Sequence, residues 1–250
     1  MKMKNKLLAL MLISGLALTG CNKPTEENKN DTQQEVSVEE KEGTQSEIDT
    51  KDEESTEELK TSFYIDKYGE VLDNAEGKKV LTWYSEPSCG ACMHALKNTK
   101  SHKEEYLGDN AVEEINIVAF LGDYSTTAAG YLVSIINQEK EIANDFYEGL
   151  FDPDFTNGLE PTEDDLKELY DRVGGKDWEK IREKLGESKK AVEEKTKSFM
   201  ENEDLIEASP AKDKEGNKYV YTPFIYSDGE VVELKENIDL VEEIKKLLED

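Results

Sequence analysis

Two cysteines, Cys89 and Cys92, stand three residues apart where an expected strand leads into an expected helix. The apolar run 80–84 is typical of a buried strand, and residues 93–99 have the character of a helix. A thiol at a helix N-terminus lies near unpaired N–H groups and the positive end of the helix dipole, which favour its thiolate. The second thiol lies one turn further on, close enough to form a disulfide with the first. The spacing therefore predicts a redox-active dithiol at a strand–helix junction.

The N-terminal 20 residues have the order of a secretory signal peptide, with a basic start, an apolar core from Leu7 to Leu18, and small residues. That core is too short to span a membrane as a helix. The sequence that ends in Gly20-Cys21 resembles the lipobox of bacterial lipoproteins, in which the cysteine is lipidated. We therefore expect residues 1–20 to be a lipoprotein signal peptide and Cys21 to carry the lipid. The alternative is an ordinary signal peptide followed by a chance cysteine.

Removing Cys21 from the count leaves Cys89 and Cys92 as the cysteines of the mature chain. An exported protein that relies on structural disulfides carries more of them. A bridge across two intervening residues also closes a loop too small to stabilise a fold strongly. The pair is therefore interpreted as redox-active.

Residues 22–60 are acidic and contain few large apolar side chains. This segment carries 14 Asp or Glu against 5 Lys. Such a composition buries too little surface to offset its ordering entropy, so residues 21–60 are expected to form a lipidated, disordered tether.

The net charge of −27 for the whole chain argues against nucleic-acid binding, which requires a basic face. It equally argues against electrostatic docking on anionic lipid, so membrane attachment is expected through Cys21 alone.

Residues 61–250 are long enough for one domain with a sizeable core. Short leading strands are expected at 63–65 and 71–72, and the helix that begins at Cys89 is expected to run to about Tyr106. A second buried strand is predicted at 115–121, which makes a right-handed βαβ unit with a parallel strand pair. The next 80 residues, about 125–204, have helical periodicity.

Strand character returns at 219–226, and a turn then leads into a partner strand at 231–234. Apolar residues from Ile238 to Leu248 predict an amphipathic C-terminal helix. The charged segment 205–218 is interpreted as a surface loop beside the cysteine pair.

This order of elements resembles the DsbA-like branch of the thioredoxin superfamily, in its bacterial lipoprotein form. The resemblance covers residues 80–250 and rests on Trp83-Tyr84 before Cys89-Gly90-Ala91-Cys92, the late helices, and Thr222-Pro223 at a strand start. It implies an α/β, thioredoxin-like fold with a helical insertion. Thr222-Pro223 matches the cis-proline that faces the cysteines in that family; a proline is tolerated there because a strand start needs no ladder donor.

The resemblance implies an extracytoplasmic, membrane-anchored thiol-disulfide oxidoreductase on the outer face of the bacterial cytoplasmic membrane. Cys89 is expected to be the exposed nucleophile and Cys92 to resolve the mixed disulfide. Thr222 and Pro223 are expected to receive the substrate strand. The expected partners are cysteine-containing exported proteins and a membrane redox protein that recycles the pair; no metal or organic cofactor is needed.

The sequence departs from the family in having Gly90-Ala91, where DsbA itself has Pro-His. One stabiliser of the Cys89 thiolate is then missing. His94 is a candidate to replace it in part, and Glu86 is a candidate to raise the thiol pKa or to move a proton. The alternative is that His94 is an ordinary exposed helical histidine and that Glu86, one of 58 acidic residues, has neither role.

Three other functions remain open. The first alternative is a thiol reductase or isomerase of the same fold, since Gly90-Ala91 does not decide the direction of exchange. A zinc site is the second alternative, with Cys89, Cys92, His94 and His102 as ligands, although these spacings fit no common finger. The third is a non-catalytic thioredoxin-like binding lipoprotein, since fold does not fix function.

Overall fold

The structure, a computed structural model, describes residues 58–152, 155 and 161–249. The expected signal peptide, Cys21 and nearly all of the expected tether lie outside these residues. None of the described helices is both long enough and apolar enough to cross a membrane.

Within the described residues the strands form one six-stranded mixed sheet, in the order β2-β1-β4-β3-β5-β6. The parallel pair is β3 and β4, with Trp83 opposite Ile115, and the other neighbouring strands are antiparallel. The predicted βαβ unit is therefore confirmed. The strands are β1 (Ser62–Ile65), β2 (Val71–Leu72), β3 (Lys79–Ser85), β4 (Ala111–Ile117), β5 (Phe224–Ser227) and β6 (Glu230–Val231).

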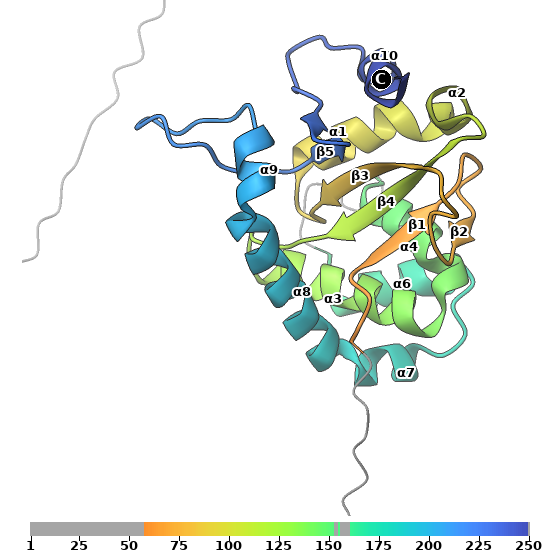
Figure 1. Cartoon of the computed structure of the whole chain (residues 1–250). Coiled ribbons are helices and arrows are strands. Elements are labelled where there is room, and N and C mark those ends of the chain that lie inside the picture. The colour runs from red at the N-terminus through yellow and green to blue at the C-terminus, as the bar shows by residue number, and fades with distance from the viewer. Residues whose placement is uncertain (1–57, 153–154, 156–160, 250) are drawn as a thin grey trace, which may run out of the picture. The chain divides into compact units, whose positions relative to one another are not determined.

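Helices connect β3 to β4, fill the long connection from β4 to β5, and end the chain (Figure 1). The first connection holds α1 (Gly90–Thr99), η1 (Lys100–His102) and α2 (Lys103–Leu107). The long connection holds α3 (Asp123–Gln138), η2 (Lys140–Ile142), α4 (Ala143–Leu150), α6 (Glu163–Arg172), α7 (Trp178–Glu183), α8 (Leu185–Glu201) and α9 (Glu203–Ala208). The C-terminal helix is α10 (Leu240–Glu249).

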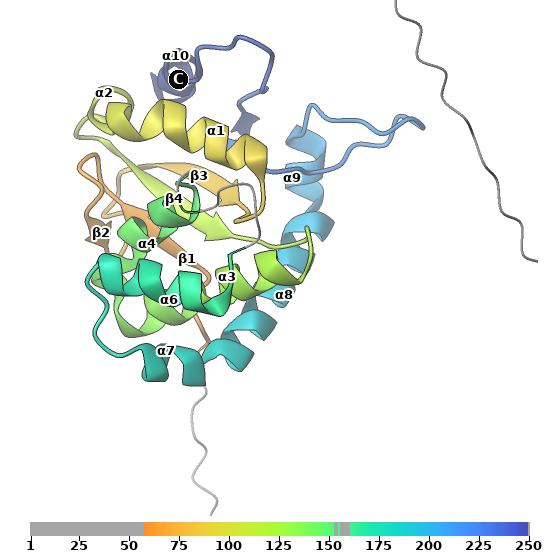
Figure 2. The ribbon, with the colours of Figure 1, turned by 180° about the vertical axis from the view of Figure 1, so that it is seen from behind.

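The helices lie in two groups around the sheet. The helix α10 packs against α1 and α2, and these three lie together above the sheet in both views (Figures 1 and 2). The helices α3, α6 and α7 lie below it, with α8 packed against α3 along one side. The alternating burial of β3, with Leu81, Trp83 and Ser85 inside, gives one sheet face to the main core.

Polar side chains cap the N-termini of two helices in the long connection. The Thr162 side chain accepts a hydrogen bond from the Asp165 N–H, and the Asp165 carboxylate accepts one from Thr162, so α6 begins with a capping box. Asp177 caps α7 in the same manner by accepting from the Lys180 N–H at 3.2 Å. These side chains satisfy N–H groups that the first helical turn leaves unpaired.

Three predicted boundaries were wrong. The strand expected at 115–121 begins at Ala111 and ends at Ile117, because the following N–H groups of Ala119, Phe120 and Leu121 bond to side chains instead of a neighbouring strand. The strand expected at 219–226 begins at Phe224, directly after a proline that has no N–H to donate. Its partner strand ends at Val231.

The expected surface loop at 205–218 also needs correction. Its first residues belong to α9, which Asn202 caps by accepting a hydrogen bond from the Leu205 N–H. Leu205 is buried in a small cluster with Val118, Phe199 and Phe224. The remaining residues form a mostly exposed loop that projects from the molecule beside α9 (Figure 1).

Candidate active site

The cysteine pair lies where β3 turns into α1, as the sequence predicts. After Ser85 the chain makes a short turn in which the Cys89 N–H donates to the Glu86 carbonyl at 3.0 Å. Cys89 then becomes the N-cap of α1, with extended backbone angles, and its sulfur accepts a hydrogen bond from the Cys92 N–H at 3.1 Å. The first sulfur therefore takes the place that a Ser or Asp side chain occupies in other helices.

Both cysteines are free thiols, and both are buried. The exposed fraction is 7% for Cys89 and 3% for Cys92. The expectation of an exposed Cys89 is thus wrong for this reduced form, in which Cys92 and Thr222 contact its sulfur from two directions.

The two thiols have opposite electrostatic environments. A hydrogen bond from the Cys92 side chain lowers the pKa of the Cys89 thiol to about 6, against an opposing effect of burial; Thr222 and the N–H groups of Ala91 and Cys92 add to the lowering. Burial raises the pKa of Cys92 well above its usual value, and the hydrogen bond and charge of Cys89 raise it further. Near neutral pH the pair therefore holds one thiolate, on Cys89, and one proton, on Cys92.

The segment before β5 completes the surroundings of Cys89. The peptide bond between Thr222 and Pro223 is cis. The Thr222 carbonyl lies 3.4 Å from the Cys89 sulfur, which donates to it when protonated. Because β5 pairs with β3, residues separated by 133 positions in the chain meet at the cysteine pair.

Glu86 is completely buried, and its carboxylate faces the segment that follows β4. One carboxylate oxygen, Oε1, accepts hydrogen bonds from the N–H groups of Phe120 and Leu121 and from the Ser125 hydroxyl. No pattern in the sequence identifies these three donors or predicts that this acidic side chain is buried. Within the described residues, no hydrogen bond joins the Glu86 carboxylate to either sulfur. The main-chain N–H of Glu86, in contrast, faces the Cys92 sulfur.

His94 lies on the exposed side of α1, where its ring is 3.2 Å from the Asn98 amide nitrogen. It lines a groove of about 510 Å³ between α1 and the chain that leads from β6 to α10. Sequence reasoning missed this groove, because its two walls lie about 140 residues apart in the chain. Its lining residues are Ala91, His94, Ala95, Asn98, Leu234, Lys235, Glu236, Asn237, Ile238 and Leu240.

The structure does not assemble the alternative zinc site within its described residues. No group of three or more His, Cys, Asp or Glu side chains in that part of the chain is placed to hold a metal ion. The side chain of His94 interacts with Asn98, and that of His102 pairs with Glu105 at 3.0 Å.

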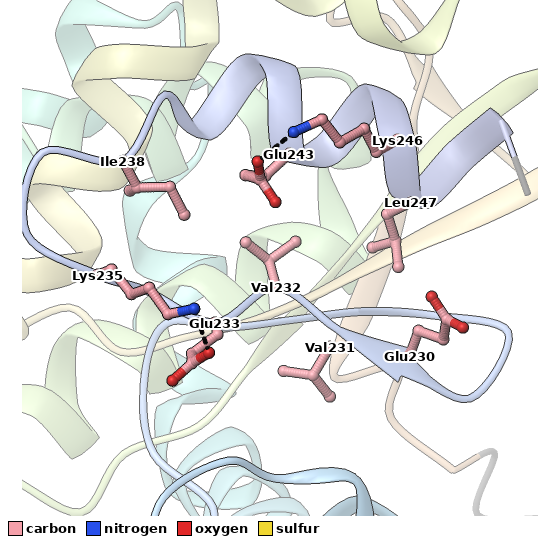
Figure 3. A pocket seen from close by; sticks show the side chains of 9 residues that line it. All are labelled: Glu230, Val231, Val232, Glu233, Lys235, Ile238, Glu243, Lys246 and Leu247. Carbon is pink, nitrogen blue, oxygen red and sulfur yellow. Dashed lines mark hydrogen bonds and ion pairs between the residues drawn. The ribbon is translucent and has the colours of Figure 1, made fainter.

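A second hollow lies between β6 and α10, away from the cysteines (Figure 3). Its volume is about 340 Å³, and neither cysteine nor Thr222 or Pro223 lines it. Two ion pairs lie around it, Lys235 with Glu233 and Lys246 with Glu243. We therefore assign it no part in the candidate site.

Solved structures with the same arrangement of elements include a DsbA from Mycobacterium tuberculosis in the reduced state. It superimposes with a TM-score of 0.52 and 19% sequence identity, over 76% of this chain and 94% of that one. MdbA, a thiol-disulfide oxidoreductase from Corynebacterium matruchotii, gives 0.53 and 19% over the same shares. A periplasmic thioredoxin-like protein from Salmonella enterica serovar Typhimurium gives 0.51 and 16%, over 74% and 88%.

The sequence itself matches no protein-family model and no curated protein. The identities to the solved structures are low, so the likeness is one of fold. What the cysteine pair does in this chain has to be argued from its own geometry.

Proposed function

We propose that this chain is a thiol-disulfide oxidoreductase that acts outside the cytoplasm. Its described part has a thioredoxin-like fold of the DsbA type with a helical insertion. The observation that carries the proposal is the unequal pair of thiols at the start of α1. Cys89 has a lowered pKa at the helix N-terminus, and Cys92 keeps its proton one turn further on. Such a pair supports exchange of disulfides with cysteine-containing exported proteins.

The proposed reaction follows from the different thiolate stabilities. In the oxidising direction, a substrate thiolate attacks the Cys89 sulfur of the disulfide, and Cys92 leaves and takes up a proton. A second substrate thiolate attacks the substrate sulfur of this mixed disulfide and releases Cys89 as a thiolate. The substrate dithiol loses two electrons, which the cysteine pair gains; one substrate proton goes to Cys92 and the other to water.

The Thr222-Pro223 segment is proposed to bind the substrate chain beside the sulfurs. The Thr222 carbonyl already lies 3.4 Å from Cys89, and a proline at the strand start has no ladder N–H of its own. An extended substrate segment is expected to pair with backbone groups of Thr222, which is a form of strand addition.

Exchange activity is tested with cysteine variants in an insulin-reduction assay and in refolding of a reduced substrate. Cys89→Ser is expected to abolish both activities, because it removes the attacked sulfur. Cys92→Ser is expected to accumulate mixed disulfides, because the resolving thiol is gone. Full activity of Cys89→Ser would refute the proposed role of this cysteine pair. No activity of the unaltered protein in either assay would leave the non-catalytic binding lipoprotein as the better account.

The direction of exchange is proposed to be oxidation. Stabilising the Cys89 thiolate stabilises the reduced form, which makes the disulfide a stronger oxidant. A reductase or isomerase remains the competing function of the same fold. A reductase is expected to have a reduction potential of about −270 mV, and an isomerase one of about −180 mV. A strong oxidant has a reduction potential of about −120 mV.

The proposed location is the outer face of the bacterial cytoplasmic membrane, with the lipid on Cys21. The support is the lipobox-like sequence at Gly20-Cys21 and the acidic residues that follow it. Cys21→Ser is expected to release the protein from membrane fractions of cells while leaving its exchange activity intact. Retention of the variant in the membrane would contradict lipid anchoring through this cysteine.

A membrane redox partner is proposed to recycle the pair, because each turnover leaves the cysteines reduced. The redox state in cells is measured by acid quenching and alkylation of free thiols. A pair kept oxidised in growing cells is expected for a disulfide donor, whereas a pair kept reduced would contradict the oxidising direction.

A further inference from the structure

The Glu86 carboxylate is a charged group that the proposed exchange chemistry does not use, and it is completely buried. Its Oε1 accepts from Phe120 N–H at 2.8 Å, Leu121 N–H at 2.6 Å and Ser125 Oγ at 2.8 Å. Its Oε2 is also buried, and no described residue hydrogen bonds to it. Burying a carboxylate is costly unless its hydrogen bonds compensate, so the position of this side chain is tightly determined.

The three donors belong to the start of the helical insertion. Phe120 and Leu121 precede α3, and Ser125 lies in its first turn. The N-cap of α3 is Gly122, which has no side chain to accept from the first turn. The Glu86 carboxylate binds the two N–H groups just before this N-cap and the Ser125 hydroxyl in the first turn, near the positive end of the helix dipole.

The main chain of the same residue contacts the cysteine pair. The Glu86 carbonyl accepts from the Cys89 N–H at 3.0 Å, and the Glu86 N–H faces the Cys92 sulfur. Glu86 thus contacts α3 through its side chain and the turn that holds both cysteines through its main chain.

We infer that Glu86 is a positioning residue for the redox pair, fastening the Cys89 turn to α3 so that Cys92 and the α1 N-terminus stay aligned with the Cys89 sulfur. The inference rests on the proposed redox function of the pair. It makes the helical insertion part of the redox site, because the three anchoring donors come from that insertion.

The sign of one effect separates this role from a direct effect of charge. Loss of the anchor loosens the groups that hydrogen bond to the Cys89 thiolate, which raises the Cys89 pKa and makes the pair more reducing. Removing a nearby negative charge would instead favour the thiolate and make the pair more oxidising. Positioning and charge therefore predict opposite shifts for Glu86→Ala.

Glu86→Gln distinguishes the two roles further. The glutamine carbonyl can still accept the three hydrogen bonds, and its amide takes the place of the unpartnered Oε2. Positioning predicts an equilibrium constant with glutathione close to that of the unaltered protein.

Glu139 supplies the matched control, because it is also a buried glutamate with three donors. It accepts from Tyr170 Oη at 2.6 Å and from the N–H groups of Lys176 and Asp177, within the insertion. Glu139→Ala is expected to lower the unfolding temperature without changing the redox equilibrium.

The experiment equilibrates the full chain and its variants with glutathione buffers and measures the fraction of oxidised pair. Glu86→Ala is expected to favour the disulfide by about tenfold, which corresponds to about 30 mV towards more negative potentials. Ser125→Ala removes one donor and little volume, and it is expected to shift the equilibrium constant in the same direction by about twofold. This variant replaces Glu86→Ala in the test if Glu86→Ala does not fold.

An unshifted equilibrium in Glu86→Ala, or in Ser125→Ala where it replaces that variant, would overturn the inference. A more oxidising pair in Glu86→Ala or Glu86→Gln would overturn it in favour of charge. A shift of Glu86→Gln towards a more reducing pair, as large as that of Glu86→Ala, would also overturn it, because the three retained hydrogen bonds would then not hold the pair in place. An equal shift in Glu139→Ala would reduce the effect to general destabilisation. No reversible couple in the unaltered protein would instead refute the proposed function itself.

Discussion

The two cysteines are identical side chains three residues apart, and the protein gives them different chemistry. Cys89 takes the N-cap of α1 and receives hydrogen bonds there, while Cys92 lies deeper in the core with an exposed fraction of 3%. Hydrogen bonds that favour the charged form outweigh burial at Cys89, whereas burial dominates at Cys92. The order of reaction in the proposed exchange follows from this difference.

The rate of Cys89 alkylation is the direct test at this scale. Because the thiolate is the reacting species, the rate in the reduced protein is expected to rise with pH around a midpoint of about 6. The measurement is modification by iodoacetamide followed by mass spectrometry. In Cys89→Ser, the remaining Cys92 is expected to react only at much higher pH. A midpoint near 8.5, the value of an unperturbed cysteine, would contradict the described environment.

Individual site residues could be predicted from the sequence when their partners are close in the chain. The pair at Cys89 and Cys92 is visible in the spacing alone, and its place at the helix start follows from the strand before it. The environment of Glu86 could not be predicted, because its donors are peptide N–H groups and a hydroxyl more than 30 residues away. The cis form of Thr222-Pro223 was suggested only by resemblance.

At the scale of elements, long periodic segments were predicted more accurately than strand ends. The apolar stripes of α3, α8 and α10 extend over several turns, so a few misplaced residues do not change their period. The strand β4 was predicted to continue through apolar residues to Leu121. It stops at Ile117 because the N–H groups from Ala119 onward bond to the side chains of Thr196 and Glu86, which no local pattern indicates.

The contact between α6 and the start of α7 gives a prediction about packing. A Cβ atom at Gly175 would lie within 2.2–2.4 Å of the Tyr170 ring, whose hydroxyl is fixed by Glu139. Gly175→Ala is therefore expected to lower the free energy of unfolding by about 1–3 kcal/mol, measured by urea denaturation.

Gly186→Ala is the matched control, because no heavy atom lies within 4 Å of a Cβ at that helical position. It is expected to be neutral or to raise stability by up to about 1 kcal/mol, since alanine favours a helix over glycine. Equal destabilisation by both variants would show that the Tyr170 contact is not the cause.

At the scale of the whole molecule, the redox state couples to stability through the Cys89 pKa. The folded-state pKa of about 6 lies below that of an unfolded cysteine, near 8.5, so the unfolded chain binds more protons between these values. The reduced protein is therefore expected to gain stability as the pH rises from about 6 to about 8, relative to the oxidised protein. Below pH 8 Cys92 is protonated in both states and adds little.

The measurement is thermal unfolding of the oxidised and reduced forms across this pH range. The difference in Tm between the two forms is expected to change steadily in favour of the reduced form as pH rises. The Cys89→Ser variant, which cannot form the disulfide, is expected to show the pH profile of Tm of the oxidised form. A difference that stays constant with pH would contradict the stabilised thiolate.

The overall architecture was predicted because its connectivity is specific. A strand, a helix begun by two cysteines, a parallel strand, a helical block and a proline before a hairpin form an order that resembles the DsbA-like branch, and that resemblance implied the fold. The acidic composition contributed little to the fold, since net charge governs solubility and partner choice. The lipid anchor and tether remain predictions, because they lie outside the described residues.

The central claim is that Cys89 and Cys92 form a reversible, oxidising redox couple. The most direct test is the reduction potential of the purified protein, measured by equilibration with glutathione buffers and alkylation of the free thiols. The account predicts a reversible two-electron couple that is less negative than about −180 mV, the value expected for an isomerase. A potential near about −270 mV would contradict the oxidising direction, and the absence of any reversible couple would contradict the proposed function.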